Sequence, residues 1–90
     1  MNPIEIAHGL DGEVVERRLR ALADKHDIVM TVTTSGQSGQ LTRKVPFLGN
    51  VEARYEIRTA AVVVEVLKAP GALQKTLERM LVQELGQALS

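Results

Sequence analysis

The sequence predicts an α+β domain: a four- to five-stranded antiparallel sheet with two helices packed on one face, in the order β-α-β-β-β-β-α. Two observations support this class. Short segments with an apolar residue at every second position indicate half-buried strands, and most of them occupy the middle of the chain. One segment nearer each end has apolar residues at spacings of three and four, which is typical of amphipathic helices.

The length and composition favour one folded unit. The chain has 90 residues, and neither half alone could bury enough apolar surface to offset the conformational entropy lost on folding. We therefore expect residues 1–90 to form a single α+β domain. A content of 44% hydrophobic and 24% charged residues is ordinary for a globular protein and too apolar for a disordered one.

The first strand and the first helix are predicted from the segment that ends near Asp27. A strand over about Pro3 to Ala7 follows from two isoleucines that flank a glutamate. In the next segment, HGLDGEVVERRLRALADKHD, Asp11 is a plausible N-cap of a helix. The apolar stripe of this helix is expected to comprise Val15, Leu19, Leu22 and His26. Ion pairs on its solvent side are expected between Glu13 and Arg17 and between Glu16 and Arg20.

Four further strands are predicted in the middle of the chain. A β-branched segment over residues 28–33 is followed by the glycine- and serine-rich segment TSGQSGQ, which indicates a hairpin loop over residues 34–40. The chain is expected to return over Leu41 to Phe47, with Pro46 at an edge or at the strand end. After a turn at LGN, strands are expected over Asn50 to Arg58 and Ala61 to Leu67, joined by a tight turn around Thr59 and Ala60.

The two strands of NVEARYEIRTAAVVVEV differ in the face they offer to water. In the first, apolar side chains alternate with glutamate and arginine, so the charged side is predicted to face solvent. In the second, Val62, Val64 and Val66 are expected to face the helices, which leaves Ala61, Val63, Glu65 and Leu67 outward. This modest outward patch keeps open the alternative that the strand pairs or packs with a second copy, giving a homodimer.

The closing segment APGALQKTLERMLVQELGQALS predicts a strongly amphipathic helix with Pro70 in its first turn. Its apolar positions are Leu73, Leu77, Met80, Leu81, Leu85, Ala88 and Leu89, and Glu84 lies among them. Its polar side mixes both signs of charge rather than being rich in lysine. Packing on the sheet is therefore favoured over binding to a membrane surface.

Charge and composition disfavour several classes of partner and location. Eleven basic and eleven acidic residues cancel, so no overall positive field attracts a phosphate backbone, and a nucleic-acid partner is not expected. The absence of cysteine excludes disulfides and thiolate metal sites. No apolar run approaches the roughly 20 residues of a transmembrane segment, and the start of the chain lacks the apolar core of a signal peptide, so we expect a cytoplasmic protein.

No catalytic, cofactor-binding or metal-binding residues are predicted, and no cofactor is expected. His8 beside Asp11 could act as a general base, but such a pair near a helix start is more often a local hydrogen bond or cap. His26 is expected on the apolar stripe or at the helix end, where the helix dipole favours an imidazolium. With two histidines and no cysteine, a zinc site would need carboxylates from distant segments.

Two other segments also have structural interpretations. The run from Ser35 to Gly39 lacks the lysine and the following helix of a phosphate-binding loop, so we interpret it as a hairpin turn. Arg43 and Lys44 make a small basic spot near Phe47, but a surface for single-stranded nucleic acid would need several aromatic residues. Phe47 and Tyr55 are instead expected to fill the core.

Taken over nearly its whole length, the chain resembles the polyhydroxyalkanoic acid system proteins, a family of small bacterial proteins. The resemblance rests on the first strand running into HGLDGEVVERR, on glycine-punctuated strands and on the amphipathic helix after LKAP. His8 and Leu10 match an early His-x-Leu pattern of that family. The resemblance implies association with the storage polyester system, at or near the granule surface, and it transfers no catalytic residues.

Three functions are therefore compared. The first is a non-enzymatic accessory protein of the polyhydroxyalkanoate system that binds the granule or its coat proteins. The second is a small-molecule binding domain with an apolar cleft between helix and sheet for an acyl-type ligand. The third is an enzyme that acts through His8 and a nearby acid. The first is favoured because of the resemblance, and the second is kept as its alternative.

Overall fold

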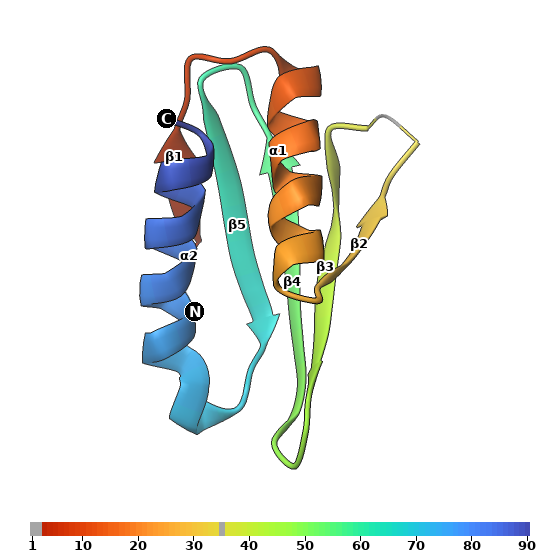
Figure 1. The fold of residues 1–90 in the computed structure, drawn as a ribbon, viewed down its shortest axis with the longest axis vertical. Helices are drawn as coiled ribbons and strands as arrows, with labels where there is room; N and C mark the ends of the chain where they lie inside the picture. The colour runs from red at the N-terminus through yellow and green to blue at the C-terminus, as the bar shows by residue number, and fades with distance from the viewer. Residues whose placement is uncertain (1–2, 35) are drawn as a thin grey trace.

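The computed structural model describes residues 3–34 and 36–90. It has two layers, an antiparallel sheet of five strands and two helices that lie on the same face of that sheet (Figure 1). The α+β class and the predicted order of elements are thus confirmed. The elements are β1 Ile4–Ala7, α1 Gly12–Lys25, β2 Val29–Val32, β3 Ser38–Val45, β4 Gly49–Ile57, β5 Ala61–Lys68, a 3₁₀ turn Gly71–Leu73, and α2 Gln74–Ala88.

The strands lie in the order β1-β5-β4-β3-β2, and every neighbouring pair is antiparallel. Consecutive hairpins join β2 to β5, so only β1 reaches its neighbour through a long connection, the helix α1 and the meander that follows it. The Ala61–Lys68 strand, which we considered for edge pairing with a second copy, lies between β1 and β4. Strand β4 pairs along β5, and β1 pairs with residues 61–64, so this first half of β5 has no edge left for a second copy. The edges of the sheet are β1 and β2.

The core lies between the helices and the inner face of β1, β5 and β4. On β4, Ala53, Tyr55 and Ile57 are buried, and on β5, Val62 and Val64 are fully buried, as the alternation predicts. The helices contribute Val15, Leu19, Leu85 and Leu89 to the same cluster. Ala61 was predicted to face outward, but it is buried at the start of β5, where it pairs with Ala7 and adjoins the His8 turn.

Helix α1 begins after Asp11, which is the N-cap in position but whose side chain makes no capping hydrogen bond. The predicted stripe is observed, since Val15 and Leu19 are buried while Leu22 is partly buried against the core. Of the two expected ion pairs, Glu16–Arg20 is formed, with 3.4 Å between Arg20 Nη2 and Glu16 Oε1. The helix ends at Lys25, and Asp27 then takes a positive φ of 57° that turns the chain back toward the sheet.

The loop predicted over residues 34–40 is shorter than expected, because β3 starts at Ser38 rather than at Leu41. Gly39 explains the difference. A Cβ at Gly39 would collide with the carbonyl oxygen of Thr31 and lie 2.7 Å from the hydroxyl of Tyr55. This glycine therefore marks a close approach within the sheet rather than a turn.

Two prolines lie at the ends of elements. Strand β3 ends at Val45, so the prediction of a strand end at Pro46 is confirmed, while Phe47 lies in the turn before β4 and not in the strand. Pro70 precedes a separate 3₁₀ turn, and α2 itself starts at Gln74. In both places proline lies where no backbone N–H is needed for a ladder or a helix.

Candidate functional site: an apolar groove and the neighbouring hairpin tip

An apolar groove of about 160 Å³ lies between α2 and the sheet; two other hollows are larger, about 520 and 540 Å³, but their linings contain more polar residues. Ten of the twelve residues that line the apolar groove are apolar, and the two polar ones are Arg43 and Thr76. The apolar lining comprises Ile28, Leu41, Val45, Val51, Ala53, Val66, Leu73, Leu77, Met80 and Leu81. Strands β3, β4 and β5, the 3₁₀ turn, α2 and the connection between α1 and β2 all contribute to this lining.

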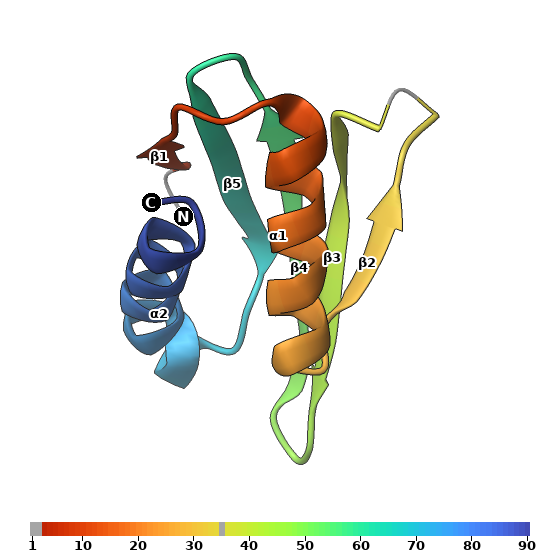
Figure 2. The same cartoon turned by 45° about the horizontal axis from the view of Figure 1, so that its top comes forward.

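The groove exists because the two helices cover different parts of the sheet. Helix α1 runs over the end of the sheet near the β4–β5 turn and stops well before the other end (Figure 1). Helix α2 contacts β1 and α1 and stands toward the β1 side of the sheet, which Figure 2 shows from above. Beyond the end of α1, no helix covers the inner face of the β3–β4 hairpin. Helix α2 borders this uncovered face on one side.

The pairing of β4 with β5 is irregular at this place. Ala53 pairs with Val66 while Glu52 pairs with Lys68, so Leu67 is an extra residue on β5. Such a bulge increases local twist and bends the strand. It lies where the β3–β4 hairpin leaves the covered part of the sheet, and the side chain of Leu67 is about half exposed.

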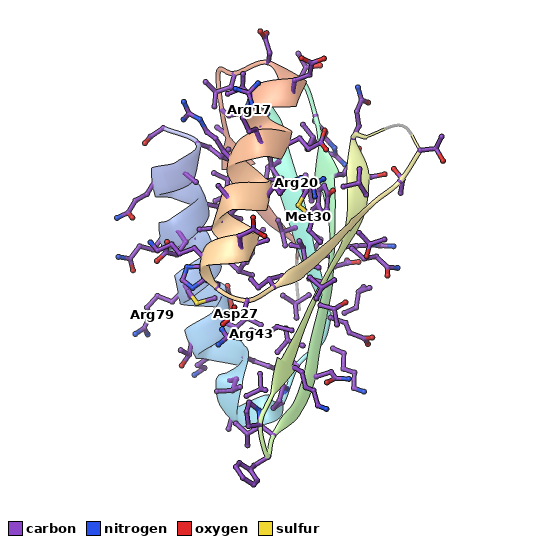
Figure 3. The ribbon with its side chains drawn as sticks, turned by 45° about the vertical axis from the view of Figure 1, so that its right-hand side comes forward. Arg17, Arg20, Asp27, Met30, Arg43 and Arg79 are labelled. Carbon is purple, nitrogen blue, oxygen red and sulfur yellow. The ribbon has the colours of Figure 1, made fainter. Side chains whose placement is uncertain are left out.

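Arg43 occupies an unusual position in the groove. In β3, Leu41 pairs with Ala53 and Arg43 pairs with Val51, so the arginine lies in the same inward-facing row as the apolar residues. In Figure 3 its side chain extends from the hairpin toward α2. Its guanidinium has no hydrogen-bond or ion-pair partner within residues 3–34 and 36–90. Arg43 is thus the one charged side chain among the residues that line the groove.

The tip of the β3–β4 hairpin adjoins the groove and is apolar. We define the hairpin tip as Pro46, Phe47 and Leu48. Phe47 is fully exposed and Leu48 is about half exposed. The prediction that Phe47 fills the core is therefore wrong, because the hairpin extends beyond α1 and no element lies over its end (Figure 1). The same prediction for Tyr55 is confirmed.

The backbone of the hairpin tip is strained. The N–H of Leu48 donates to the carbonyl of Val45 at 3.2 Å, and Phe47 has a φ of 68°. Proline at the second position and a positive φ at the third are features of a type II turn, where glycine or asparagine normally takes the third position. A phenylalanine held in this conformation and fully in water contributes nothing to the core, which is a reason to consider a role in binding.

His8 is a structural residue in this fold. It is buried, its Nε2 lies 2.9 Å from the carbonyl oxygen of Arg58, and its Nδ1 accepts the backbone N–H of Leu10 at 3.2 Å. With Nδ1 accepting, Nε2 carries the proton and donates to Arg58. Both ring nitrogens are thus used to join the β1–α1 connection to the β4–β5 turn, which leaves no lone pair for a general base.

His26 lies at the end of α1, as predicted, and faces α2. Its Nε2 is 3.6 Å from a carboxylate oxygen of Glu84, and Lys25 Nζ is 3.9 Å from the same oxygen. Glu84, placed by the sequence among the apolar positions of the last helix, therefore meets two basic side chains of α1. This cluster connects the two helices next to the groove.

Of the Ser35–Gly39 segment, Gly36 and Gln37 lie in the connection between β2 and β3, Ser38 and Gly39 belong to β3, and Ser35 lies outside the described residues. Thr33 N–H donates to the carbonyl of Ser38 at 2.9 Å, and Gly36 N–H donates to the carbonyl of Thr33 at 3.0 Å. A strand follows instead of a helix, so the hairpin interpretation is confirmed.

Within residues 3–34 and 36–90, no group of three or more histidine, aspartate or glutamate side chains is arranged to hold a metal ion. Neither helix in this part of the chain has the length and hydropathy to cross a bilayer. Comparison with protein-family models, with curated proteins and with solved structures finds no match to this chain.

The sequence interpretation considered Arg43 only as part of a basic spot. A stronger signal was available in the alternation of Leu41, Arg43 and Val45, which puts a charge into an inward-facing row. Val51, Ala53, Val66 and the apolar positions of the last helix were expected to face the core, and their pattern alone does not distinguish a filled interior from an open one.

Proposed function

We propose that this protein is a non-enzymatic, cytoplasmic binding domain that holds an acyl-type chain in the apolar groove. The polyhydroxyalkanoate storage system, indicated by the sequence resemblance, is the proposed context. The observation that carries the proposal is a hollow of about 160 Å³ with ten apolar lining residues and two polar ones. Concave, mostly apolar sites with a few polar groups are the usual form of small-molecule sites.

The size of the groove supports a short or medium chain. An apolar cavity of about 150 Å³ holds a molecule the size of benzene, with about six carbon atoms. The groove has a similar volume, so about six to eight methylene groups fit, and a longer chain would extend over Val45 toward the hairpin tip. Burial of each methylene is worth about 0.8 kcal/mol, which gives a chain of this length a measurable affinity.

The test is an amide NMR titration with octanol, an uncharged ligand of suitable length. We expect chemical-shift changes at Val51, Ala53, Leu77 and Met80, which line the groove, and none at the outward-facing residues of β4. A matched pair of α2 variants sharpens the test. Leu77→Asp places a charge in the groove and should abolish the shifts, whereas Val82→Asp makes the same change at an exposed position outside it.

Absence of any shift along the inward strand residues would remove this function. Equal loss of binding in the two aspartate variants would also count against it, since a general effect on α2 and not the groove would then be responsible.

A second candidate function, docking on the surface of a polyester granule or on its coat proteins, is favoured by the hairpin tip. Phe47 and Leu48 present apolar side chains at the end of the molecule, and Lys44 lies close by on the outer face of β3. An exposed apolar side chain in a strained turn can enter a hydrophobic phase without unfolding the domain.

Co-sedimentation with polyester particles tests this candidate. We expect Phe47→Asn to reduce the bound fraction several-fold, because asparagine tolerates the positive φ and removes the apolar ring. Val29→Thr is the control, since it changes another exposed apolar residue, at the start of β2, and keeps the preference for strand. Wild-type protein that stays in solution, or a tagged copy that stays diffuse in granule-rich cells, would contradict docking.

A further inference from the structure

The groove combines an apolar interior with a single unpaired cation, and this combination identifies the head group of the ligand. We infer that the groove is selective for a carboxylic acid, with the hydrocarbon chain inside and the carboxylate bound by Arg43. This inference rests on the proposed function, since it concerns the chemistry of the same groove.

The first support is the position of the arginine. Gln40, Thr42 and Lys44 occupy the outward row of β3, where polar side chains meet water, whereas Arg43 lies in the inward row opposite Val51. A charge in an inward row is costly unless the charge finds a partner or reaches water. Arg43 reaches the mouth of the groove, where its side chain is exposed.

The second support is the lack of a partner within the protein. Three other arginines have one: Arg20 pairs with Glu16, Arg54 with Glu65, and Arg58 with Glu56. Exposed basic residues outside the groove, such as Arg17 and Arg79, also lack one among the described residues, so the distinguishing feature of Arg43 is an unpaired charge within an apolar lining. The guanidinium of Arg43 has none within residues 3–34 and 36–90. Its planar set of donors matches a carboxylate in a bidentate arrangement.

The third support is the composition of the remaining lining. Thr76, on α2, is the other polar residue of the groove, and it is neutral. No carboxylate lines the groove, so an anionic head group would meet no repulsion from the lining. An ester or an alcohol would fill the same space but would leave the guanidinium without an anion.

The alternative explanation is that Arg43 only covers the groove with its aliphatic stem while its charge stays in water. The variant Arg43→Met separates the two explanations, because methionine keeps an unbranched apolar stem and removes the charge. Lys44→Met is the matched control: it removes the same charge from the next residue of the same strand, on the opposite face. Both positions are exposed, so both variants should fold.

The experiment measures binding of octanoic acid, octanol and methyl octanoate to the full chain at pH 7 by calorimetry, with amide NMR to locate each ligand. For wild type we expect the acid to bind about tenfold more tightly than the two neutral ligands, which is the lower range for a charge-assisted hydrogen bond. Arg43→Met should remove this difference by weakening the binding of the acid, and Lys44→Met should preserve the difference. Added salt should weaken binding of the acid alone.

The results distinguish selectivity for a carboxylate from binding of an apolar chain in the groove. Equal affinity for all three ligands, unchanged in Arg43→Met, overturns selectivity for acids and leaves a groove that binds any apolar chain. An equal loss in Arg43→Met and Lys44→Met also overturns it, because general electrostatic attraction then accounts for the preference. If none of the three ligands binds, the proposed function fails, and the assignment of Arg43 fails with it.

Discussion

The two ends of the β3–β4 hairpin have the same alternating pattern but different surroundings. At one end, Tyr55 and Ile57 are 2% and 6% exposed beneath α1. At the other end, Val45 and Val51 are only partly buried, and Phe47 is entirely in water. The strand pattern sets which side chains face the helices, and the length of the covering helix decides whether they are buried.

The covered and open ends of the hairpin are expected to serve stability and ligand binding, respectively. The covered end holds the side chains with complete packing and should account for most of the free energy of folding. The open end contains the groove and the hairpin tip, where apolar side chains lie beside empty space or water. Substitutions at the two ends should therefore have separable effects on unfolding and on binding.

The largest effect on stability is expected from Leu19→Ala in α1. Leu19 is 3% exposed, and truncation of a fully buried leucine costs about 2–5 kcal/mol of the free energy of unfolding. Leu77→Ala is the matched change in α2, where the side chain borders the groove and is only partly buried. Truncation of Leu77 removes less buried apolar surface and leaves no enclosed cavity. The loss in the free energy of unfolding should therefore stay below about 2 kcal/mol.

Urea unfolding of both variants measures the difference. Equal losses would show that the groove is packed as tightly as the covered end, and the contrast between the two ends would be wrong.

A smaller loss is expected from Gly39→Ala, at the covered end of β3. The added methyl group would meet the carbonyl of Thr31 and the ring and hydroxyl of Tyr55, so we expect a loss of about 1–3 kcal/mol. Gly86→Ala provides the opposite case, because nothing lies near the new Cβ and alanine is favoured in a helix by up to about 1 kcal/mol. Thermal unfolding should show a lower midpoint for the first variant and a higher midpoint for the second. A stable Gly39→Ala protein would mean that β2 and β3 can separate without cost.

The smallest effect at neutral pH is expected from Tyr55→Phe. The hydroxyl of Tyr55 is buried without a hydrogen-bond partner among the described residues, so its removal should change stability by no more than about 0.5 kcal/mol at pH 7. Burial raises the pKa of this phenol above its ordinary value of 10.0; the negative charge of Glu16 raises it further, and Arg20 opposes the change.

The raised pKa of Tyr55 gives its stability contribution a defined dependence on pH. The folded state holds the phenolic proton more tightly than the unfolded state, so this contribution is fully present below pH 10.0 and declines as pH rises through the higher pKa of the folded protein. The chain has one tyrosine and no tryptophan, so the ultraviolet absorbance of the phenolate reports this group alone. Urea unfolding in alkali should show a steeper loss for wild type than for Tyr55→Phe, and parallel losses would contradict the raised pKa.

The sequence alone determined which side chains share a face. Alternation in β4 and β5 predicted Tyr55, Ile57 and the valines as inward, and spacings of three and four predicted the stripe of α1. These patterns are local, because the backbone geometry of a strand or a helix repeats over two residues or about 3.6 residues whatever lies opposite. The α+β class and the order of elements follow from them.

The tertiary structure decided how far each inward face is covered. Phe47 and Val45 continue the apolar character of the hairpin, yet α1 ends at Lys25 before reaching them, and no local pattern shows where one element ends against another. The same is true of the central place of β5, of the close approach at Gly39, and of Arg43 at a groove instead of in a basic surface spot. Burial depends on contacts between segments far apart in the chain, so only the packed arrangement of helices and sheet established which apolar faces form the core and which remain open to a ligand.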